Sequence, residues 1–249
     1  MSEYQHYEFR AIDRPLTINE QQAVASLSSR VDPHPRKAIF IYSYSDFPSN
    51  EVDIVAKYYD AMFYLANWGT KQLIFRFPSE LIDIDEIGRF YVDACVTCQQ
   101  CDEYVVVNIF YEADEPSDEW FEDIDILDLL IPLREDILRG DYRSLYLAWL
   151  ATTKYERRNG EIEEEPDAPA GLKNLSPALE AFVDVFEVDR TDLKMAQSGS
   201  PDIVEMSEKA LQETIDAMPS KEKVRWLIRL AKGEESNLGP KFRRFIEVR

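Results

Sequence analysis

The stretch Asn50-Glu-Val-Asp-Ile-Val-Ala-Lys-Tyr-Tyr-Asp-Ala-Met-Phe-Tyr-Leu-Ala-Asn-Trp-Gly-Thr-Lys-Gln-Leu-Ile-Phe-Arg-Phe-Pro78 carries the strongest fold signal in the chain. Apolar residues recur at three- and four-residue steps over residues 50–68, which predicts one long helix capped by Gly69. The aromatic residues on this stripe indicate that the helix packs on a sheet. Gln72–Phe77 is then expected to form a strand that Pro78 ends.

The residues before this stretch alternate strand and helix signals. Tyr7–Ala11 alternates apolar and polar side chains, which predicts a strand. Thr17 and Glu20 have the spacing of a capping box, so a helix is expected from residue 18 to about residue 29. Ala38–Tyr44 is rich in Ile, Phe and Tyr and predicts a second strand.

The residues after this stretch change from a strand pattern to a helical one. Residues 89–97 and 103–111 predict a hairpin, and helices are expected over 118–138, 142–155, 176–185, 191–197, 202–218 and 220–231. The fold class is therefore α+β. We expect an N-terminal mixed sheet of about five strands with two covering helices, followed by an all-helical C-terminal half.

Changes in composition divide the chain into four segments. Residues 161–172 hold five acids in the first seven positions, together with Pro166, Pro169 and Gly171, which is typical of a linker. We expect an α/β sheet domain at 1–116 and a helical hairpin packed on it at 117–158. An acidic, Pro-rich linker at 159–174 and a C-terminal helical region at 175–249 complete this division.

The charge of the chain is concentrated and bipolar. Between Glu80 and Leu130 there are sixteen acidic side chains and one basic side chain, Arg89, in a chain whose net charge is -20. Lys221–Arg249 instead holds nine Lys or Arg against four Glu, a net charge of +5, which leaves -25 for the rest. Such an acidic surface repels nucleic acid and anionic membranes, so the charge pattern favours a basic protein partner.

Composition also indicates a packed interior and a reducing compartment. Apolar residues make up 45% of the 249 positions, with thirteen Phe, thirteen Tyr and four Trp, unlike disordered acidic chains. The N-terminus lacks a signal-peptide pattern, and no apolar run approaches the roughly 18 residues that span a bilayer. Three cysteines cannot form a disulfide framework, so we expect a cytoplasmic protein with no membrane association.

The cysteines form a compact motif, Cys95-Val-Thr-Cys98-Gln-Gln-Cys101. Thiolates at this spacing can converge on zinc or begin an iron–sulfur ligand set. On an uninterrupted strand, however, Cys98 would point away from the other two, and neither His6 nor His34 has the spacing of a fourth ligand. Buried or loop cysteines are the favoured interpretation, no cofactor is expected, and a metal-binding protein stays as an alternative.

Motifs for common catalytic chemistry are absent from the sequence. It contains no Gly-x-Ser-x-Gly elbow, no Gly-x-Gly and no Gly-Lys-Ser/Thr, so hydrolase triads are disfavoured and both common phosphate-binding loops are absent. We therefore expect a non-enzymatic protein without a small-molecule substrate. An enzyme that uses carboxylates alone, such as a glycosidase with two carboxyl groups about 5 to 10 Å apart, stays open.

The candidate partner-binding residues lie in the middle of the acidic stretch: Glu119, Trp120, Phe121, Glu122 and Asp123. Carboxylates speed the encounter with a basic partner, whereas buried aromatic side chains provide most of the affinity. The sequence therefore predicts an interaction protein. An acidic nucleic-acid mimic that inhibits a DNA- or RNA-binding protein is the alternative, and direct binding of nucleic acid is disfavoured because the body of the chain would repel phosphates.

Several stretches together resemble a family of uncharacterised bacterial proteins. They are Ala11-Ile-Asp-Arg-Pro-Leu-Thr17, Tyr64-Leu-Ala-Asn-Trp-Gly-Thr70, Ile131-Pro-Leu-Arg134, Leu138-Arg-Gly-Asp141 and Leu145-Tyr-Leu-Ala-Trp-Leu150. The resemblance implies no reaction, cofactor or catalytic residue. In size, acidity and accessory-like character the chain is also similar to small proteins encoded beside CRISPR effector-protease systems. That similarity implies a complex with other products of the same operon, in antiviral defence.

Overall fold

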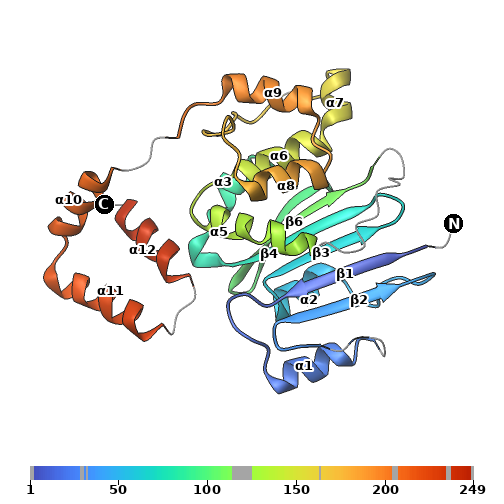
Figure 1. Ribbon diagram of the computed structural model, residues 1–249, viewed down its shortest axis with the longest axis horizontal. Coiled ribbons are helices and arrows are strands. Elements are labelled where there is room, and N and C mark those ends of the chain that lie inside the picture. The colour runs from blue at the N-terminus through green and yellow to red at the C-terminus, as the bar shows by residue number, and fades with distance from the viewer. Residues whose placement is uncertain are drawn as a thin grey trace.

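A six-stranded antiparallel sheet forms the centre of the molecule (Figure 1). The computed structural model describes residues 3–28, 31, 33–113, 125–162, 164–203, 207–233 and 237–247. The strands are β1 (Gln5–Arg10), β2 (Lys37–Tyr42), β3 (Ala61–Ala66), β4 (Lys71–Pro78), β5 (Val96–Cys101) and β6 (Tyr104–Tyr111), in the order β2-β1-β3-β4-β6-β5. The expected α+β fold is confirmed, although the sheet has six strands and every pairing is antiparallel.

Helices cover the sheet and make up most of the second half of the chain (Figure 1). They are α1 (Ile18–Ala25), α2 (Glu51–Tyr58), the 3-10 turn η1 (Ser79–Leu81), α3 (Ile84–Gly88), α4 (Ile126–Leu130), α5 (Pro132–Leu138), α6 (Arg143–Thr152), α7 (Lys154–Asn159), α8 (Pro177–Val185), α9 (Arg190–Gly199), α10 (Glu208–Ala217), α11 (Ser220–Lys232) and α12 (Leu238–Glu247). Over the described ranges, none of these helices has both the length and the apolarity needed to cross a membrane.

The first helix begins as the sequence predicts. The Thr17 hydroxyl accepts a hydrogen bond from the Glu20 backbone N–H, and the Glu20 carboxylate accepts one from the Thr17 backbone N–H, which completes the capping box. The helix ends at Ala25, four residues before the expected end. Its start is determined locally, whereas its length is not.

The long helix expected over residues 50–68 is wrong in its second half. Asn50 does cap a helix, because its side chain accepts a hydrogen bond from the Asp53 N–H, but α2 ends at Tyr58. Ala61–Ala66 forms strand β3, which lies between β1 and β4 and is buried on both faces. A strand buried on both faces is apolar at nearly every position, so its pattern can be mistaken for part of a helix.

Gly69 belongs to the turn between β3 and β4 and does not cap a helix. Its φ of 97° lies in the left-handed region, which glycine adopts without strain. The Gly69 N–H donates to the Ala66 carbonyl, and the Ala66 N–H donates to the Thr70 carbonyl, which closes the hairpin. The glycine that suggested the end of a helix therefore makes strand pairing possible.

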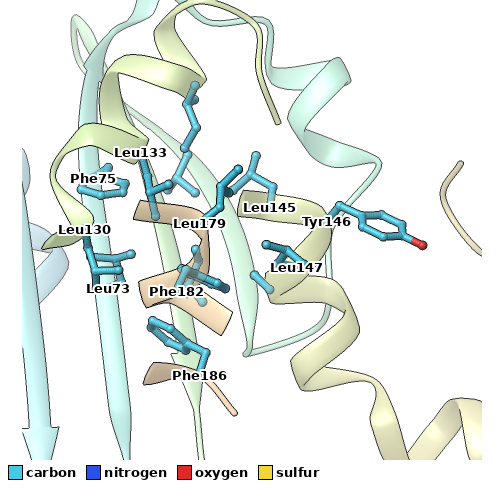
Figure 2. Packing of buried hydrophobic residues seen from close by; sticks show 14 of the residues in the cluster. Leu73, Phe75, Leu130, Leu133, Leu145, Tyr146, Leu147, Leu179, Phe182 and Phe186 are labelled. Carbon is cyan, nitrogen blue, oxygen red and sulfur yellow. The ribbon is translucent and has the colours of Figure 1, made fainter. Parts of the chain in front are cut away.

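The two faces of the sheet support two separate cores. Phe9, Phe40 and Tyr64 lie on the face that α1 and α2 cover, where Tyr59 and Val55 complete the cluster. The opposite face is covered by α4, α5, α6 and α8 (Figure 2). Its cluster includes Leu73, Phe75, Leu130, Leu133, Leu145, Leu147, Leu179, Phe182 and Phe186. Strand alternation lets β3, β4 and β6 supply both clusters.

Residues on both sides of the expected linker share the larger core. Phe182 of α8 and Phe186, directly after this helix, stack with their ring centroids 4.4 Å apart, and Phe186 also contacts Phe63 of β3. The end of the linker is held in place, because Arg143 Nη1 donates to the Gly171 carbonyl. Gly171 has a φ of +86°, and a Cβ there would lie 2.4 Å from Ile203 Cδ1, so this turn requires glycine.

Candidate functional site

Four charged side chains from distant parts of the chain meet at one end of the sheet. Asp13 follows β1, Asp60 precedes β3, Arg76 lies near the end of β4 and Arg134 belongs to α5. Because β1 and β3 are antiparallel, the end of one and the start of the other lie side by side. We call these four residues the charged junction.

Asp60 and Arg76 form its buried ion pair. Arg76 Nη2 donates to Asp60 Oδ1 at 2.7 Å, and both side chains are at most 5% exposed. The second carboxylate oxygen, Oδ2, accepts hydrogen bonds from the backbone N–H groups of Ile12 and Asp13 at 2.6 and 2.9 Å. A buried carboxylate is costly unless its oxygens are bonded, and here both of them are.

Asp13 and Arg134 form the second ion pair of the junction. Arg134 Nη1 and Nη2 donate to the two carboxylate oxygens of Asp13 at 3.0 and 2.8 Å, a bidentate arrangement. Arg134 Nε also donates to the backbone carbonyl of Arg76 at 2.9 Å. Through Arg134, helix α5 is bound both to the loop after β1 and to strand β4. The charged junction therefore attaches a helix that covers one face of the sheet to the end of its central strands.

A cavity of about 460 Å³ adjoins the charged junction. It is lined by Asp13, Arg14, Arg76, Pro78, Ser79, Glu80, Glu103 and Tyr104. Both guanidinium groups are already engaged, Arg14 with Glu20 and Arg76 with Asp60, and the Arg76 guanidinium also lies 4.3 Å from the centroid of the Tyr104 ring. The described residues that line the cavity include no histidine or cysteine.

The chain's own basic C-terminal helix lies at the mouth of this cavity. Lys241 Nζ of α12 is 2.7 Å from Glu80 Oε1, and Asn237 Nδ2 just before α12 donates to Asp13 Oδ2 at 3.2 Å. Helix α12 also packs against η1, which contains Glu80. An ammonium group from a helix is thus already bound by a carboxylate of the acidic stretch.

Exposed acids continue from this mouth along α3. We define the α3 surface as Asp83, Ile84, Asp85, Glu86, Tyr91 and Asp93, all of which are exposed. Ile84 and Tyr91 are large apolar side chains that remain in solvent among the carboxylates. Some carboxylates of the acidic stretch pair with the chain's own bases, as Glu86 does with Arg89 on this surface and Asp128 does with Arg10 at 2.7 Å.

The predicted partner-binding residues Glu119, Trp120, Phe121, Glu122 and Asp123 lie outside the described residues. The acidic residue that follows them in the described part, Asp125, forms an ion pair with Lys37 at 3.2 Å. This ion pair places Asp125 next to β2. Strand β2 is one edge of the sheet, and β5 is the other edge.

The structure separates two of the three cysteines that the sequence groups. Cys98 packs against the core under α6 and α8, whereas Cys101 packs against the core under α1 and α2, because an odd separation along β5 turns them to opposite faces. In the part of the chain that the structure describes, no three His, Cys, Asp or Glu side chains form a group able to hold a metal ion. Burial raises the pKa of Cys98 to about 11 and also raises that of Cys95, so both thiols are protonated at neutral pH.

Sequence reasoning missed the charged junction, although a signal for it exists. Asp60 stands between Tyr59 and Ala61, and Arg76 interrupts an otherwise apolar strand. A single charge inside an apolar run is buried on folding and therefore requires a buried counter-charge. The sequence contains both partners but does not indicate which acid pairs with which base.

Comparison with protein-family models, curated proteins and solved structures finds no match to this chain. The function proposed below therefore depends on the chain's own residues and their geometry.

Proposed function

We propose that this protein is a non-enzymatic interaction protein that binds a basic segment of a partner protein. The binding surface comprises the mouth of the cavity, with Glu80 and Glu103, and the adjoining α3 surface. This proposal retains the basic partner that the charge pattern predicts. The proposed contact lies on Glu80, Glu103 and the α3 surface, all of which belong to the described part of the chain.

The contact between α12 and this surface is the observation that carries the proposal. Lys241 of the chain's own basic helix pairs with Glu80, and α12 packs on η1. A helix rich in Lys and Arg is therefore compatible with this surface in shape and in charge. A partner segment of similar chemistry would bind in the same way, either beside α12 or in its place.

Apolar side chains among the acids provide the anchors that such binding needs. Ile84 and Tyr91 are exposed between carboxylates, and long-range attraction alone gives rate and specificity more than affinity. Trp120 and Phe121, with Glu119, Glu122 and Asp123, are proposed to extend the same surface. The partner segment should therefore combine Lys or Arg with apolar residues.

The compartment and the partner's origin follow as further parts of the proposal. All three cysteines are free, which favours a reducing compartment such as the cytoplasm. The resemblance to accessory proteins of CRISPR effector-protease operons suggests that the partner is a product of the same operon.

Affinity capture from the native host tests the proposal with three versions of the full-length chain as bait. The first is the wild type and the second carries Asp85→Lys, Glu86→Lys and Glu103→Lys. The third carries Glu161→Lys, Glu164→Lys and Glu165→Lys, a matched change of charge on exposed residues away from the α3 surface. We expect one basic protein that the wild type and third bait retain at low salt and the second bait loses.

Three outcomes would contradict the proposal. Equal retention by all three baits would show that the α3 surface is not the contact. Equal loss from both variants would indicate general charge attraction and no specific surface. Capture of a nuclease or repressor that duplex DNA displaces would favour the nucleic-acid mimic instead.

A further inference from the structure

Helix α11 (Ser220–Lys232) exposes an aliphatic stripe to solvent. Val224, Leu227, Ile228 and Leu230 are 53%, 63%, 51% and 54% exposed, values that are unusual for four large apolar side chains within seven residues. With about 3.6 residues per turn, Val224, Leu227, Ile228 and the exposed Ala231 lie along one side of the helix and form the stripe, whereas Leu230 lies about 120° around the axis from Val224. Such a contiguous stripe marks a surface that a partner covers.

The opposite side of α11 is the one that the fold uses. Trp226 packs against Phe242 and Phe245 of α12, with ring centroids 5.1 and 5.4 Å apart. Helix α12 in turn contacts η1 on the body of the protein. Figure 1 shows α11 at the edge of the molecule, with α12 between it and the sheet. The aliphatic stripe therefore faces away from the contacts that hold the helix.

Basic side chains flank the stripe on one side. Lys221 and Arg225 are both exposed, and a helical period places them about 60° and 100° around the axis from Val224. The stripe thus has an apolar centre and a positively charged border. An occupant should present apolar side chains at helical spacing with carboxylates along one edge.

Two other occupants fit this surface less well. A second α11 packed against the first would bring like-charged borders together, which is unfavourable. An anionic bilayer is an extended surface, so it would also meet the acidic body of the same chain. A single helix is about 10 to 12 Å wide and would touch only the stripe. Charge complementarity therefore favours a helix over a membrane.

We propose that α11 binds an acidic amphipathic helix of another protein on the face made by Val224, Leu227, Ile228 and Ala231. The chain would then have two binding surfaces of opposite character. The acidic α3 surface takes a basic segment, and the basic, aliphatic side of α11 takes an acidic helix. This second surface does not depend on the first.

Fluorescence anisotropy with a designed peptide tests the second surface. The probe is a labelled 18-residue peptide with Leu at every third or fourth position, Glu along one flank and Ala elsewhere. Its control has Gln in place of Glu, because a Lys peptide would bind the acidic α3 surface proposed above. We expect saturable binding of the Glu peptide to the full-length protein, and at least tenfold weaker binding of the Gln peptide. Leu227→Ser with Ile228→Ser should weaken Glu-peptide binding at least tenfold, since both side chains are exposed and their loss leaves the fold intact.

A second variant and a control separate the contribution of charge from nonspecific hydrophobic binding. Lys221→Glu with Arg225→Glu should abolish the preference for the Glu peptide, whereas Met195→Ser, at an exposed apolar residue of α9, should change neither affinity. Equal binding of both peptides by the wild type would overturn the proposal. Binding of the wild type to vesicles of anionic phospholipid, with no binding by the Leu227→Ser, Ile228→Ser variant, would also overturn it. A dimer in light scattering that the same variant abolishes would overturn it too.

Discussion

Arg134 donates hydrogen bonds to both carboxylate oxygens of Asp13, which lies 121 residues earlier in the sequence. The two residues belong to separate stretches, Ala11–Thr17 and Ile131–Arg134, that prompted the same family resemblance. Their contact brings the first loop of the sheet onto α5. Through the Arg134 Nε bond to the Arg76 carbonyl, this contact also reaches the strand that carries the second buried ion pair.

Removal of Asp60 tests the energetic role of the charged junction. Asp60→Ala should lower the free energy of unfolding by about 3–5 kcal/mol, because the Arg76 guanidinium would stay buried without its counter-charge. Urea unfolding at neutral pH measures this loss. Asp167→Ala, at an exposed position, is the control and should change the value by less than about 0.5 kcal/mol. Similar values for both variants would contradict a buried pair.

Truncation of Phe182 tests whether α8 belongs to the same folding unit as the sheet. The side chain is fully buried against Phe186 in the core that also contains Leu73 and Phe75. Phe182→Ala should cost about 3–5 kcal/mol of stability. Tryptophan fluorescence and far-ultraviolet circular dichroism should report one coincident urea transition. Two separate transitions would show that the helices beyond residue 175 unfold independently.

The capping carboxylate of α1 predicts a pH dependence. Hydrogen bonds from Arg14, and then from Thr17, lower the pKa of Glu20 to about 2. Because this value is below the unfolded value of about 4.3, ionised Glu20 stabilises the fold above pH 4.3, and that stabilisation is lost as the pH falls through 2. Glu20→Gln should cost about 0.5–1 kcal/mol at pH 7, since the pair is exposed, and clearly less at pH 3. An equal cost at both pH values would refute this linkage.

The raised pKa of Cys98 predicts that its thiol is alkylated slowly. Burial raises the pKa to about 11, so the reactive thiolate is scarce at pH 8. In a Cys95→Ser, Cys101→Ser variant, alkylation of Cys98 by iodoacetamide should be about 100-fold slower than that of free cysteine, or slower still. Unfolding in urea should restore the normal rate. A folded-state rate equal to that of free cysteine would show that the thiol is not buried.

A charge swap tests the contact between α12 and the cavity mouth. Glu80→Lys or Lys241→Glu alone should expose α12 to limited proteolysis, because each places like charges where an ion pair now lies 2.7 Å apart. The double variant restores opposite charges and should recover wild-type resistance. The loss in global stability should stay within about 1 kcal/mol, since Glu80 is largely exposed. Persistent sensitivity of the double variant would place the effect elsewhere.

The local parts of the fold were predictable because neighbouring residues determine them. The capping box at Thr17 and the cap at Asn50 begin helices where the sequence expects them. The strand expected over residues 103–111 forms as β6, but its partner β5 spans Val96–Cys101 and not the expected residues 89–97. The end of α2 was not predictable in the same way. Strand β3 is apolar on both sides because other strands and helices cover it, and that covering is a long-range property.

By itself, the sequence determined the α+β class, the starts of several helices, such as α1, α2 and α11, and the separation of an acidic body from a basic C-terminus, since each of these depends on composition or short spacing. Only the tertiary structure decided that Asp60 pairs with Arg76 and Asp13 with Arg134, and that Cys98 and Cys101 face apart. It also placed basic α12 against acidic Glu80 and left the aliphatic side of α11 uncovered. Pairing and exposure depend on which distant surfaces meet, and a linear pattern does not contain that information.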